Sequence, residues 1–407
     1  MAQLASYTTF LKDVLLLSVS SFGGPQAHLA HFQKVLAQKK KYVTEAELIE
    51  LNALCQVLPG PTSTQTLSAV GYKLGGPNLA YLTLLIWMFP SVTIMTVAGL
   101  LIGSYDSREV SVATRFIQPM AVGLVAYAAY TFIHKMVQTK RAATIMLGAA
   151  VVSFFVKSTF VFPAILLIAG CITAFNYKAH HHREEKKKFD VPWANFFLWV
   201  GVLVVAAVLG AVTINNPDFL PVRLFENFYR NGSLIFGGGQ VLTPLLHTEF
   251  VQYAKPTIDG VREPYLSNQE FLSGYALAQS LPGPVFSFSS YVGALAMHSR
   301  GFGLGGQIVG GIMSAIGIFL PGTFLIFFMV RMWESLKKFR PIRASLDGIN
   351  AASAGLIAAA SIILFEPLRQ DWLNYLIVFS TFSLMVFTKL PSWAVILGGL
   401  ILGLIIS

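Results

Sequence analysis

The chain has 407 residues, of which 55% are hydrophobic and 12% charged, and its formal net charge is +10. Soluble domains carry about 25% charged residues, so this composition excludes an ordinary soluble globular protein. The basic residues gather in short loops between apolar runs and not along an aromatic-rich polar face, which argues against nucleic-acid binding. We therefore expect a protein of the lipid bilayer with no nucleic-acid partner.

The first predicted element is a broken helix within residues 13–38. A helix rising from Asp13 should stop at Gly23-Gly24, and Pro25 should open the next helix, because proline suits the first helical position. The segment is short for two full crossings of a bilayer, each of which needs about 20 apolar residues. We expect a hairpin that dips partway into the membrane.

A second broken helix is predicted within residues 45–73. Thr44 and Glu47 have the spacing of a capping box, which indicates a helix start. Pro59-Gly60-Pro61 should break this helix, and Thr62 should start the next one, because proline removes a backbone donor and clashes with the preceding turn. We expect both hairpins to be re-entrant; the alternative is that they cross the bilayer fully.

Five longer apolar runs have the composition of bilayer-spanning helices. Backbone groups in lipid must be hydrogen-bonded within the structure, and Leu, Ile, Val and Phe runs with Gly and Pro suit helices better than the alternating strands of a barrel. The predicted fold class is an all-α polytopic membrane protein. The runs are Leu79 to Gly103, Phe116 to Ile133, Trp193 to Ile214, Leu304 to Val330 and Ile349 to Phe365.

The second half of the chain repeats the motifs of the first half in the same order. Ser21-Phe22-Gly23-Gly24 matches Ile235-Phe236-Gly237-Gly238, and the run Gln56 to Pro61 matches the run Gln279 to Pro284. Later landmarks also pair, namely Phe89-Pro90 with Leu320-Pro321, Val122 to Leu124 with Ala354 to Leu356, and Pro163 with Pro391. The predicted domains are a first repeat at 1–177, a linker with a connecting helix at 178–217, and a second repeat at 218–407.

Loop charge indicates that the two repeats are inverted in the membrane. The loop 105–115 is balanced in charge, whereas its counterpart 331–343 carries an excess of Lys and Arg. The next pair of loops, 134–141 and 365–372, reverses this bias. Basic loops prefer the cytoplasmic side, so equivalent loops should lie on opposite faces of the membrane, and the linker 178–190 should be cytoplasmic.

No cofactor, metal site or catalytic residue is predicted. Three adjacent histidines, His180 to His182, lie in a charged linker, where we favour a solvated loop over a metal site. The run Gly301 to Gly306 satisfies the GxGxxG pattern, but no strand precedes it, so dinucleotide binding is not expected. We predict that the protein is not an enzyme.

The broken helices define the predicted substrate site. Interruptions at corresponding points of two halves are the best sequence pointer to a site near the bilayer midplane. Helices that restart after a break present free N–H groups and partial positive charge, which bind oxyanions. Tight turns between packed helices are the alternative explanation. The predicted substrate-binding residues are Gly23, Gly24, Gln26, Gln56, Pro59, Gly60, Thr62, Ser63, Thr64, Gly237, Gly238, Gly239, Gln240, Gln279, Pro282, Gly283 and Ser287.

Titratable residues near the breaks are candidates for proton coupling. His28, His247 and Glu249 follow the two Phe-Gly-Gly motifs. Ionisable residues inside a membrane are costly and usually functional, and histidine titrates near neutral pH. Glu47 and Glu270 already have a capping role, so we assign those two to structure.

The motifs FGGPQAH, LCQVLPGPTSTQ, FGGGQVLTPLLHTE and LAQSLPGPVFSF, in this order, closely resemble the chromate ion transporter family in its two-domain form. The resemblance covers nearly the whole chain. It implies a multi-pass protein of the bacterial inner membrane that exports chromate, driven by the proton motive force, with sulfate as an alternative substrate. Family members often carry an acidic residue shortly after the first FGGP, where this chain has Gln33 and Lys34.

Three functions compete at this point. The first is an oxyanion transporter with alternating access and one central site, for which export is electrically favourable, since each charge gains about 2.3 kcal/mol per 100 mV. The second is an anion channel that uses the same helix ends, and the third is a membrane-embedded enzyme such as a reductase. The sequence leaves the choice among oxyanions and the oligomeric state open, with a homodimer as one alternative.

Overall fold

The computed structural model describes residues 7–104, 115–156, 161–175, 193–213, 216–236, 239–252, 255–256, 262–330, 332, 340–368, 371–388 and 390–406. The predicted loops 105–115 and 331–343 and the linker 178–190 lie wholly or largely outside this part of the chain. Four described helices are long and apolar enough to cross a membrane, namely Thr62–Ser104, Trp193–Val212, Leu304–Met329 and Ala344–Leu368. Together with the helical content, they confirm the predicted class of all-α polytopic membrane protein.

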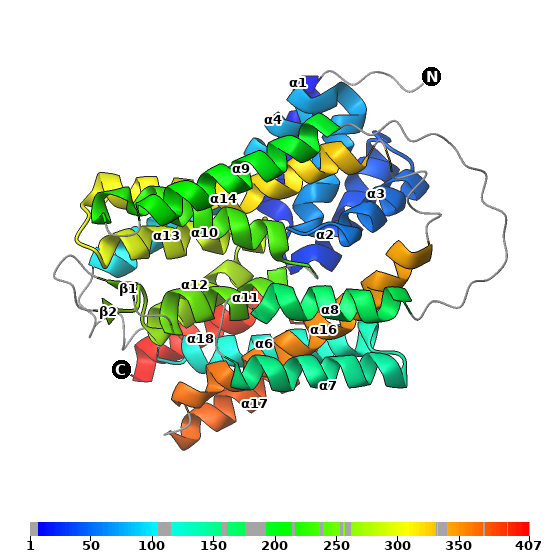
Figure 1. Cartoon of the computed structure of the whole chain (residues 1–407). Helices are drawn as coiled ribbons and strands as arrows, with labels where there is room; N and C mark the ends of the chain where they lie inside the picture. Colours follow the sequence, from blue (N-terminus) through cyan, green and yellow to red (C-terminus); the bar gives the residue numbers. More distant parts are fainter. Residues whose placement is uncertain are drawn as a thin grey trace.

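The helices lie in two layers, as Figure 1 shows. The upper layer contains α1 (Tyr7–Ser20), α4 (Thr62–Ser104), α9 (Trp193–Val212), α10 (Leu220–Leu234), α13 (Phe288–His298) and α14 (Leu304–Met329). The lower layer contains α6 (Ile117–Met136), α7 (Lys140–Phe155), α8 (Val161–Phe175), α16 (Arg340–Phe365), α17 (Trp372–Phe387) and α18 (Ser392–Ile406). Each layer draws helices from both halves of the sequence, so the two halves are interleaved.

Shorter helices follow the breaks and have the same order in both halves. The first half has α2 (Gly24–Phe32), its π-helical continuation η1 (Gln33–Lys39) and α3 (Glu45–Val57). The second half has α11 (Gly239–His247), the π-helical η3 (Thr248–Gln252), α12 (Asn268–Ser280) and the 3-10 turn η4 (Val285–Ser287). Between η3 and α12 lie the two short strands β1 (Lys255–Pro256) and β2 (Arg262–Glu263), which pair antiparallel.

Both predicted capping boxes are confirmed. The Thr44 hydroxyl accepts from the Glu47 N–H at 3.2 Å, and the Glu47 carboxylate accepts from the Thr44 N–H at 2.8 Å. Ser267 and Glu270 make the same exchange at the start of α12. Hydrogen bonds from the Lys73 ammonium and the Thr44 backbone lower the pKa of Glu47 to about 2.

Several predicted boundaries differ from the structure. The helix that restarts at Thr62 reaches Gly75 and Gly76, where the backbone angles are not helical, and a second helical stretch of α4 follows to Ser104. Gly76 has φ +71°, so the helix is interrupted close to the predicted end at Tyr72, and the apolar run from Leu79 lies in the second stretch. α16 starts at Arg340, well before the apolar run that predicted it. α6 covers the expected span at Phe116 to Ile133, but it is not among the four helices that meet the length and hydropathy of a membrane crossing.

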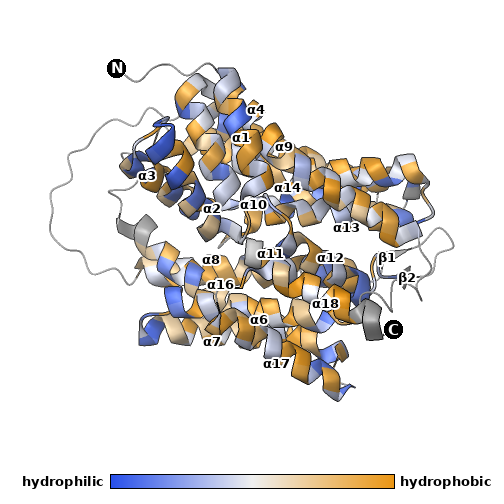
Figure 2. Cartoon of the chain, turned by 180° about the vertical axis from the view of Figure 1, so that it is seen from behind, coloured by the Kyte–Doolittle hydropathy of each residue, from blue (hydrophilic) through white to orange (hydrophobic). Residues whose placement is uncertain are grey.

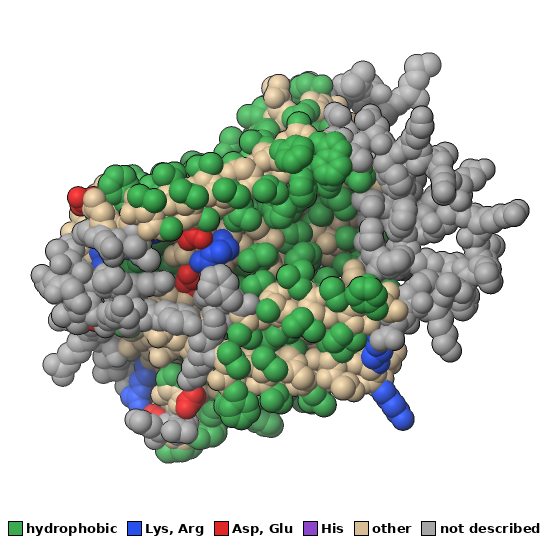
Figure 3. Space-filling model, in the orientation of Figure 1, with side chains coloured by type: hydrophobic (Ala, Val, Ile, Leu, Met, Phe, Trp, Pro, Cys, Tyr) green, Lys and Arg blue, Asp and Glu red, His purple; other side chains and the backbone are tan. Residues whose placement is uncertain are grey.

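The outer surface is apolar over most of its height. α9 is the clearest case, because only 6% of its most apolar stretch is buried within the protein. In Figure 3 hydrophobic side chains cover the helices of both layers in this view, and in Figure 2 hydrophilic residues gather on α3 and near helix ends. Exposed apolar area of this extent fits a lipid environment.

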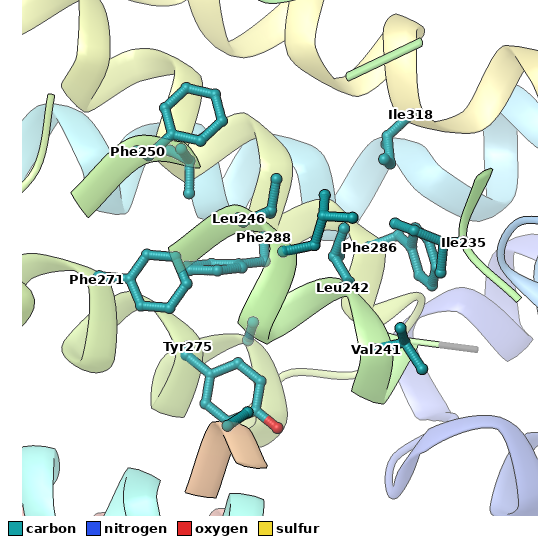
Figure 4. Close-up of a cluster of buried hydrophobic side chains, with 14 of the residues drawn as sticks. Ile235, Val241, Leu242, Leu246, Phe250, Phe271, Tyr275, Phe286, Phe288 and Ile318 are labelled. Carbon is teal, nitrogen blue, oxygen red and sulfur yellow. The ribbon is translucent and has the colours of Figure 1, made fainter. Parts of the chain in front are cut away.

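The largest apolar core surrounds α11 and α12, where Figure 4 shows side chains from several helices pointing toward one another. Phe271 stacks edge-on against Phe288 at 5.0 Å between ring centroids. Ile318 of α14 reaches the same cluster from the upper layer. This core holds the second-half helix breaks in place beside the upper layer.

Candidate substrate site

The helix breaks of the two halves interlock crosswise. The Gly60 N–H donates to the Ile235 carbonyl at 2.7 Å, and the Gly283 N–H donates to the Ser21 carbonyl at 2.9 Å. Gly60 and Gly283 are equivalent positions of the repeat, and so are Ser21 and Ile235. Each Pro-Gly-Pro break is therefore bonded to the residue that precedes the glycine motif of the other half.

Glycine is required at both crossing points by backbone conformation. Gly60 has φ +114° and Gly283 has φ +93°, where a side chain is strained. A Cβ atom at Gly60 would also meet Nε2 of Gln65 at 2.9 Å, and that amide donates to the Pro59 carbonyl at 2.6 Å. The break is thus fixed by its own chain as well as by the other half.

The α2 helix begins at the first glycine motif with an open N-terminus. Gly23 is its N-cap residue with φ +90°, and no side chain caps the helix. Pro25 lies in its first turn, as predicted. The first N–H groups of a helix have no intrahelical acceptor and carry partial positive charge, so this end is suited to an anion.

A cavity of about 250 Å³ lies beside this helix end. It holds roughly eight waters' volume at about 30 Å³ each, which is room for a small hydrated ion. All of its lining residues are neutral. They are Gly23, Gly24 and Pro25 at the first break, Tyr275, Gln279 and Val285 at the second-half break, Leu124, Tyr127, Ala128 and Thr131 on α6, and Met385, Pro391 and Ser392.

The polar lining is partly organised by internal hydrogen bonds. Gln279 Nε2 donates to the Tyr275 hydroxyl at 2.9 Å, and the Ser392 hydroxyl donates to the Gln279 carbonyl at 2.8 Å. The Thr131 hydroxyl donates to the backbone one turn earlier on α6, at 3.0 Å from the Tyr127 carbonyl. Among the described residues the Tyr127 hydroxyl has no hydrogen-bond partner, so it remains a donor for a ligand.

Most polar side chains of the cavity lining have no polar counterpart at the equivalent position of the other half. Following the matched motifs, Tyr127 and Thr131 correspond to Ala359 and Ile363, and Ser392 corresponds to Ala164. Gln56, the counterpart of Gln279, is exposed. The repeated breaks are therefore not two equal sites, because Ser63 and Thr64 at the other break contact His28 and Trp87 and do not line a matching cavity.

Other predicted binding residues serve helix packing. Ser63 lies 3.1 Å from Nδ1 of His28, and the Thr64 hydroxyl accepts from the Trp87 indole at 3.1 Å. The first contact joins α2 to α4, the second joins two parts of α4, and both lie away from the cavity lining. Thr62, Pro59, Pro282 and Ser287 also lie at the breaks without lining the cavity. Gly239 starts α11, whereas Gly237, Gly238 and the side chains of Gln26 and Gln240 lie outside the described part of the structure.

Two of the proton-coupling candidates are paired with polar groups. Glu249 Oε1 lies 2.9 Å from Nη2 of Arg230, whose Nε contacts Glu226 at 2.8 Å. His247 Nε2 lies 2.6 Å from the Asn268 amide oxygen. His28 Nε2 and Glu249 Oε2 are each buried without a hydrogen-bond partner among the described residues, and of the three candidates His28 alone contacts no charged or amide side chain there.

Sequence reasoning missed Tyr127, Thr131, Tyr275, Ser392 and Arg230. Tyr127 and Thr131 are one helical turn apart in an apolar run, so their spacing places two hydroxyls on one face of a helix. This spacing is the sequence signal that could have identified them. Metal binding has no support in the described residues, since no group of three His, Cys, Asp or Glu is placed to hold an ion. The predicted solvated histidines of the linker lie outside that part of the chain.

The fold and the site define a polytopic membrane protein with a neutral polar cavity between broken helices. The chain belongs to the chromate transporter family, which matches residues 8–175 and 222–404. Members of this family are transport proteins, in agreement with the prediction that the chain is not an enzyme.

Curated relatives are similar over nearly their whole length. A protein named chromate transport protein from Cupriavidus metallidurans is 25% identical over 96% of this chain and 91% of its own. A probable chromate transport protein from Synechococcus elongatus is 26% identical over 92% and 87%. An uncharacterized transporter from Methanocaldococcus jannaschii is 24% identical over 98% and 93%. No solved structure matches the chain.

Proposed function

We propose that this protein transports chromate across the membrane and binds it in the cavity beside α2. The observation that carries the proposal is the position of an uncapped helix N-terminus against a 250 Å³ cavity lined by hydroxyl and amide groups. The names of the curated relatives support chromate as the substrate.

The chemistry of the cavity suits a tetrahedral oxyanion that must also leave. Tyr127 and Gln279 present hydrogen-bond donors, and the α2 N-terminus presents N–H groups with partial positive charge. Because no lining residue is a cation, the anion is held without a fixed ion pair that would slow its release. Sulfate has the same charge and shape, so it is the competing substrate.

Export is the proposed direction, and the bacterial inner membrane is the proposed location. A dianion leaving a negative interior gains about 2.3 kcal/mol per charge per 100 mV, so the membrane potential alone favours exit. The basic loops assign the linker to the cytoplasmic side.

Unequal packing of the two broken helices supports alternating access by inverted repeats. α12 packs against α6 and α18 of the lower layer as well as against α13 and α4. Its counterpart α3 packs chiefly against α4 and η1 on the upper side. Two equivalent elements in different environments are expected when one side of a repeat protein is closed and the other is open.

Proton coupling is proposed to use His28. Its ring is buried, Nδ1 contacts Ser63, and Nε2 has no hydrogen-bond partner, so protonation of Nε2 is costly in this state and requires a state in which Nε2 meets water or an acceptor. Glu249 is engaged by Arg230 and His247 by Asn268, which makes them weaker candidates. His28→Gln should remove any stimulation of transport by a pH gradient at fixed membrane potential. A wild-type rate that is indifferent to that gradient would remove coupling from the proposal.

Uptake of radiolabelled chromate into inverted membrane vesicles tests the function. We expect saturable, potential-dependent uptake that unlabelled chromate abolishes and sulfate competes with. Uptake no greater than in vesicles lacking the protein would contradict chromate transport. Chromate flux that does not saturate, together with large single-channel currents, would show that the protein is an anion channel and not a carrier.

A further inference from the structure

A long groove of about 900 Å³ runs along the outside of the upper layer. It is formed by α1 and α4 of the first half and by α14 of the second half. This groove is separate from the cavity beside α2, and they share no lining residue. Its walls are Thr8, Leu11, Lys12, Leu15, Leu85, Ile86, Met88, Phe89, Val92, Thr93, Thr96, Val97, Leu100, Ile308, Ile312, Ala315 and Ile316.

The groove walls require an apolar occupant. Phe89 is 67% exposed and Leu85 is 55% exposed, so these side chains are not covered by the protein itself. The two α4 hydroxyls in the lining are already used, since Thr93 donates to the Phe89 carbonyl at 2.8 Å and Thr96 to the Val92 carbonyl at 2.9 Å. An exposed apolar surface of this size marks a site of interaction with another apolar molecule.

The length of the groove fits an acyl chain. Its α4 wall extends from Leu85 to Leu100. At about 1.5 Å of rise per residue this wall is roughly 22 Å long, compared with roughly 15 Å for one leaflet of a hydrocarbon core about 30 Å thick. The groove is therefore long enough to hold the whole length of one acyl chain of a lipid.

One end of the groove carries a positive charge. Tyr7 lies against the kink of α4, where a Cβ atom on Gly75 would approach the Tyr7 ring at 2.9 Å. Since α1 runs along α4 from that end, Lys12 lies at the Leu85 end of the groove. Lys12 is exposed and takes no part in the ion pairs among the described residues.

The neighbouring carboxylate does not neutralise Lys12. Asp13 is bound by Lys40 at 3.0 Å and by the Tyr42 hydroxyl at 2.5 Å. The same end of the molecule holds Lys73 and the basic stretch Lys39 to Lys41, which identifies it with the cytoplasmic leaflet. That leaflet is the one in which anionic lipids attract basic side chains.

We propose that an anionic phospholipid occupies this groove, with one acyl chain along α4 and α14 and its phosphate at the Lys12 ammonium. The lipid joins the two halves on the outer face of the upper layer. This proposal does not depend on the substrate or on the direction of transport.

Native mass spectrometry of the full-length protein with phosphatidylglycerol or phosphatidylcholine tests this site. Wild-type protein should retain phosphatidylglycerol about fivefold more than phosphatidylcholine, the preference expected from one lysine at the phosphate. Lys12→Gln should bring the ratio near one, and Lys12→Arg should preserve it. Lys135→Gln, which removes an exposed lysine on α6, should leave it unchanged.

A second variant tests the apolar part of the groove. Val97→Trp should fill the space between α4 and α14 and reduce retention of both lipids, while chromate transport shows that the protein is folded. Equal retention by wild type and Lys12→Gln would overturn the proposal. A dimer that forms without bound lipid and that Val97→Trp dissociates would also overturn the proposal. In that case a second copy of the chain would occupy the groove.

Discussion

At the scale of single residues, the Tyr127 hydroxyl is the most direct test of the cavity. It lines the cavity and has no hydrogen-bond partner among the described residues. Tyr127→Phe should raise the KM for chromate about 10-fold to 100-fold, because a hydrogen bond to a charged group contributes about 1.5–3 kcal/mol. Vesicle uptake measured over a range of chromate concentrations gives this constant.

The neighbouring tyrosine on α6 supplies the matched control for that measurement. Tyr130 is 38% exposed and packs against His134 and Phe382 outside the cavity lining. Tyr130→Phe should leave the KM within about twofold, the usual range for surface changes of under about 0.5 kcal/mol. Equal effects of the two substitutions would mean that the chromate site lies elsewhere.

Residues with local roles were predictable, whereas residues that meet across helices were not. Thr44 with Glu47 follows a capping pattern that four consecutive positions define, and the structure confirms it. Tyr127 and Ser392 come together only because α6 and the start of α18 pack beside the second-half break. The Arg230–Glu249 ion pair likewise depends on how α10 packs beside η3, so no short sequence window contains it.

At the scale of an element, the Pro-Gly-Pro break depends on a glycine in a left-handed conformation. Gly60→Ala should destabilise the protein by about 1–2 kcal/mol from backbone strain alone. The added methyl group would also press on the Gln65 amide, whereas its distance to Gly322 of α14 is an ordinary contact. We expect a lower midpoint of thermal unfolding in detergent, followed by tryptophan fluorescence.

Gly148→Ala on α7 is the control for the break. Gly148 lies within a regular helix, and a Cβ atom there would meet nothing within 4 Å. Alanine is the better helix former by about 1 kcal/mol, so this change should leave the midpoint unchanged or raise it. A Gly60→Ala protein as stable as the wild type would show that the break tolerates other conformations.

Helix starts were predictable from the sequence, but helix continuations were not. Proline and glycine act within a few residues, so the starts of α2 and α4 follow from Pro25 and Pro61. The π-helical ends η1 and η3 are closed differently, since the Tyr42 N–H donates to the Leu36 carbonyl six residues earlier, whereas the Tyr265 N–H donates to the Phe250 carbonyl fifteen residues earlier. No local motif marks either position.

At the scale of the whole molecule, the crosswise bonds couple the two halves. Gly60 to Ile235 and Gly283 to Ser21 tie each break to the opposite half, so one break cannot move without affecting the other. The different packing of α3 and α12 then means that the two sides of the protein are not in equivalent conformations. The repeat could be found in the sequence because its motifs keep their order, but this asymmetry depends on tertiary packing that the motifs do not record.

The two equivalent glutamines report that asymmetry. Gln56 on α3 is exposed, whereas Gln279 on α12 is partly buried and lines the cavity. In a Cys171→Ser background, where Cys55 is buried, Gln56→Cys should react with a membrane-impermeant maleimide faster than Gln279→Cys in inverted vesicles. A chromate gradient that populates the opposite state should slow the reaction at Gln56→Cys. It should speed the reaction at Gln279→Cys when the maleimide is added on the other face of the membrane. Rates that stay unchanged by chromate would contradict alternating access, because the exchange of environments between α3 and α12 is what such a mechanism requires.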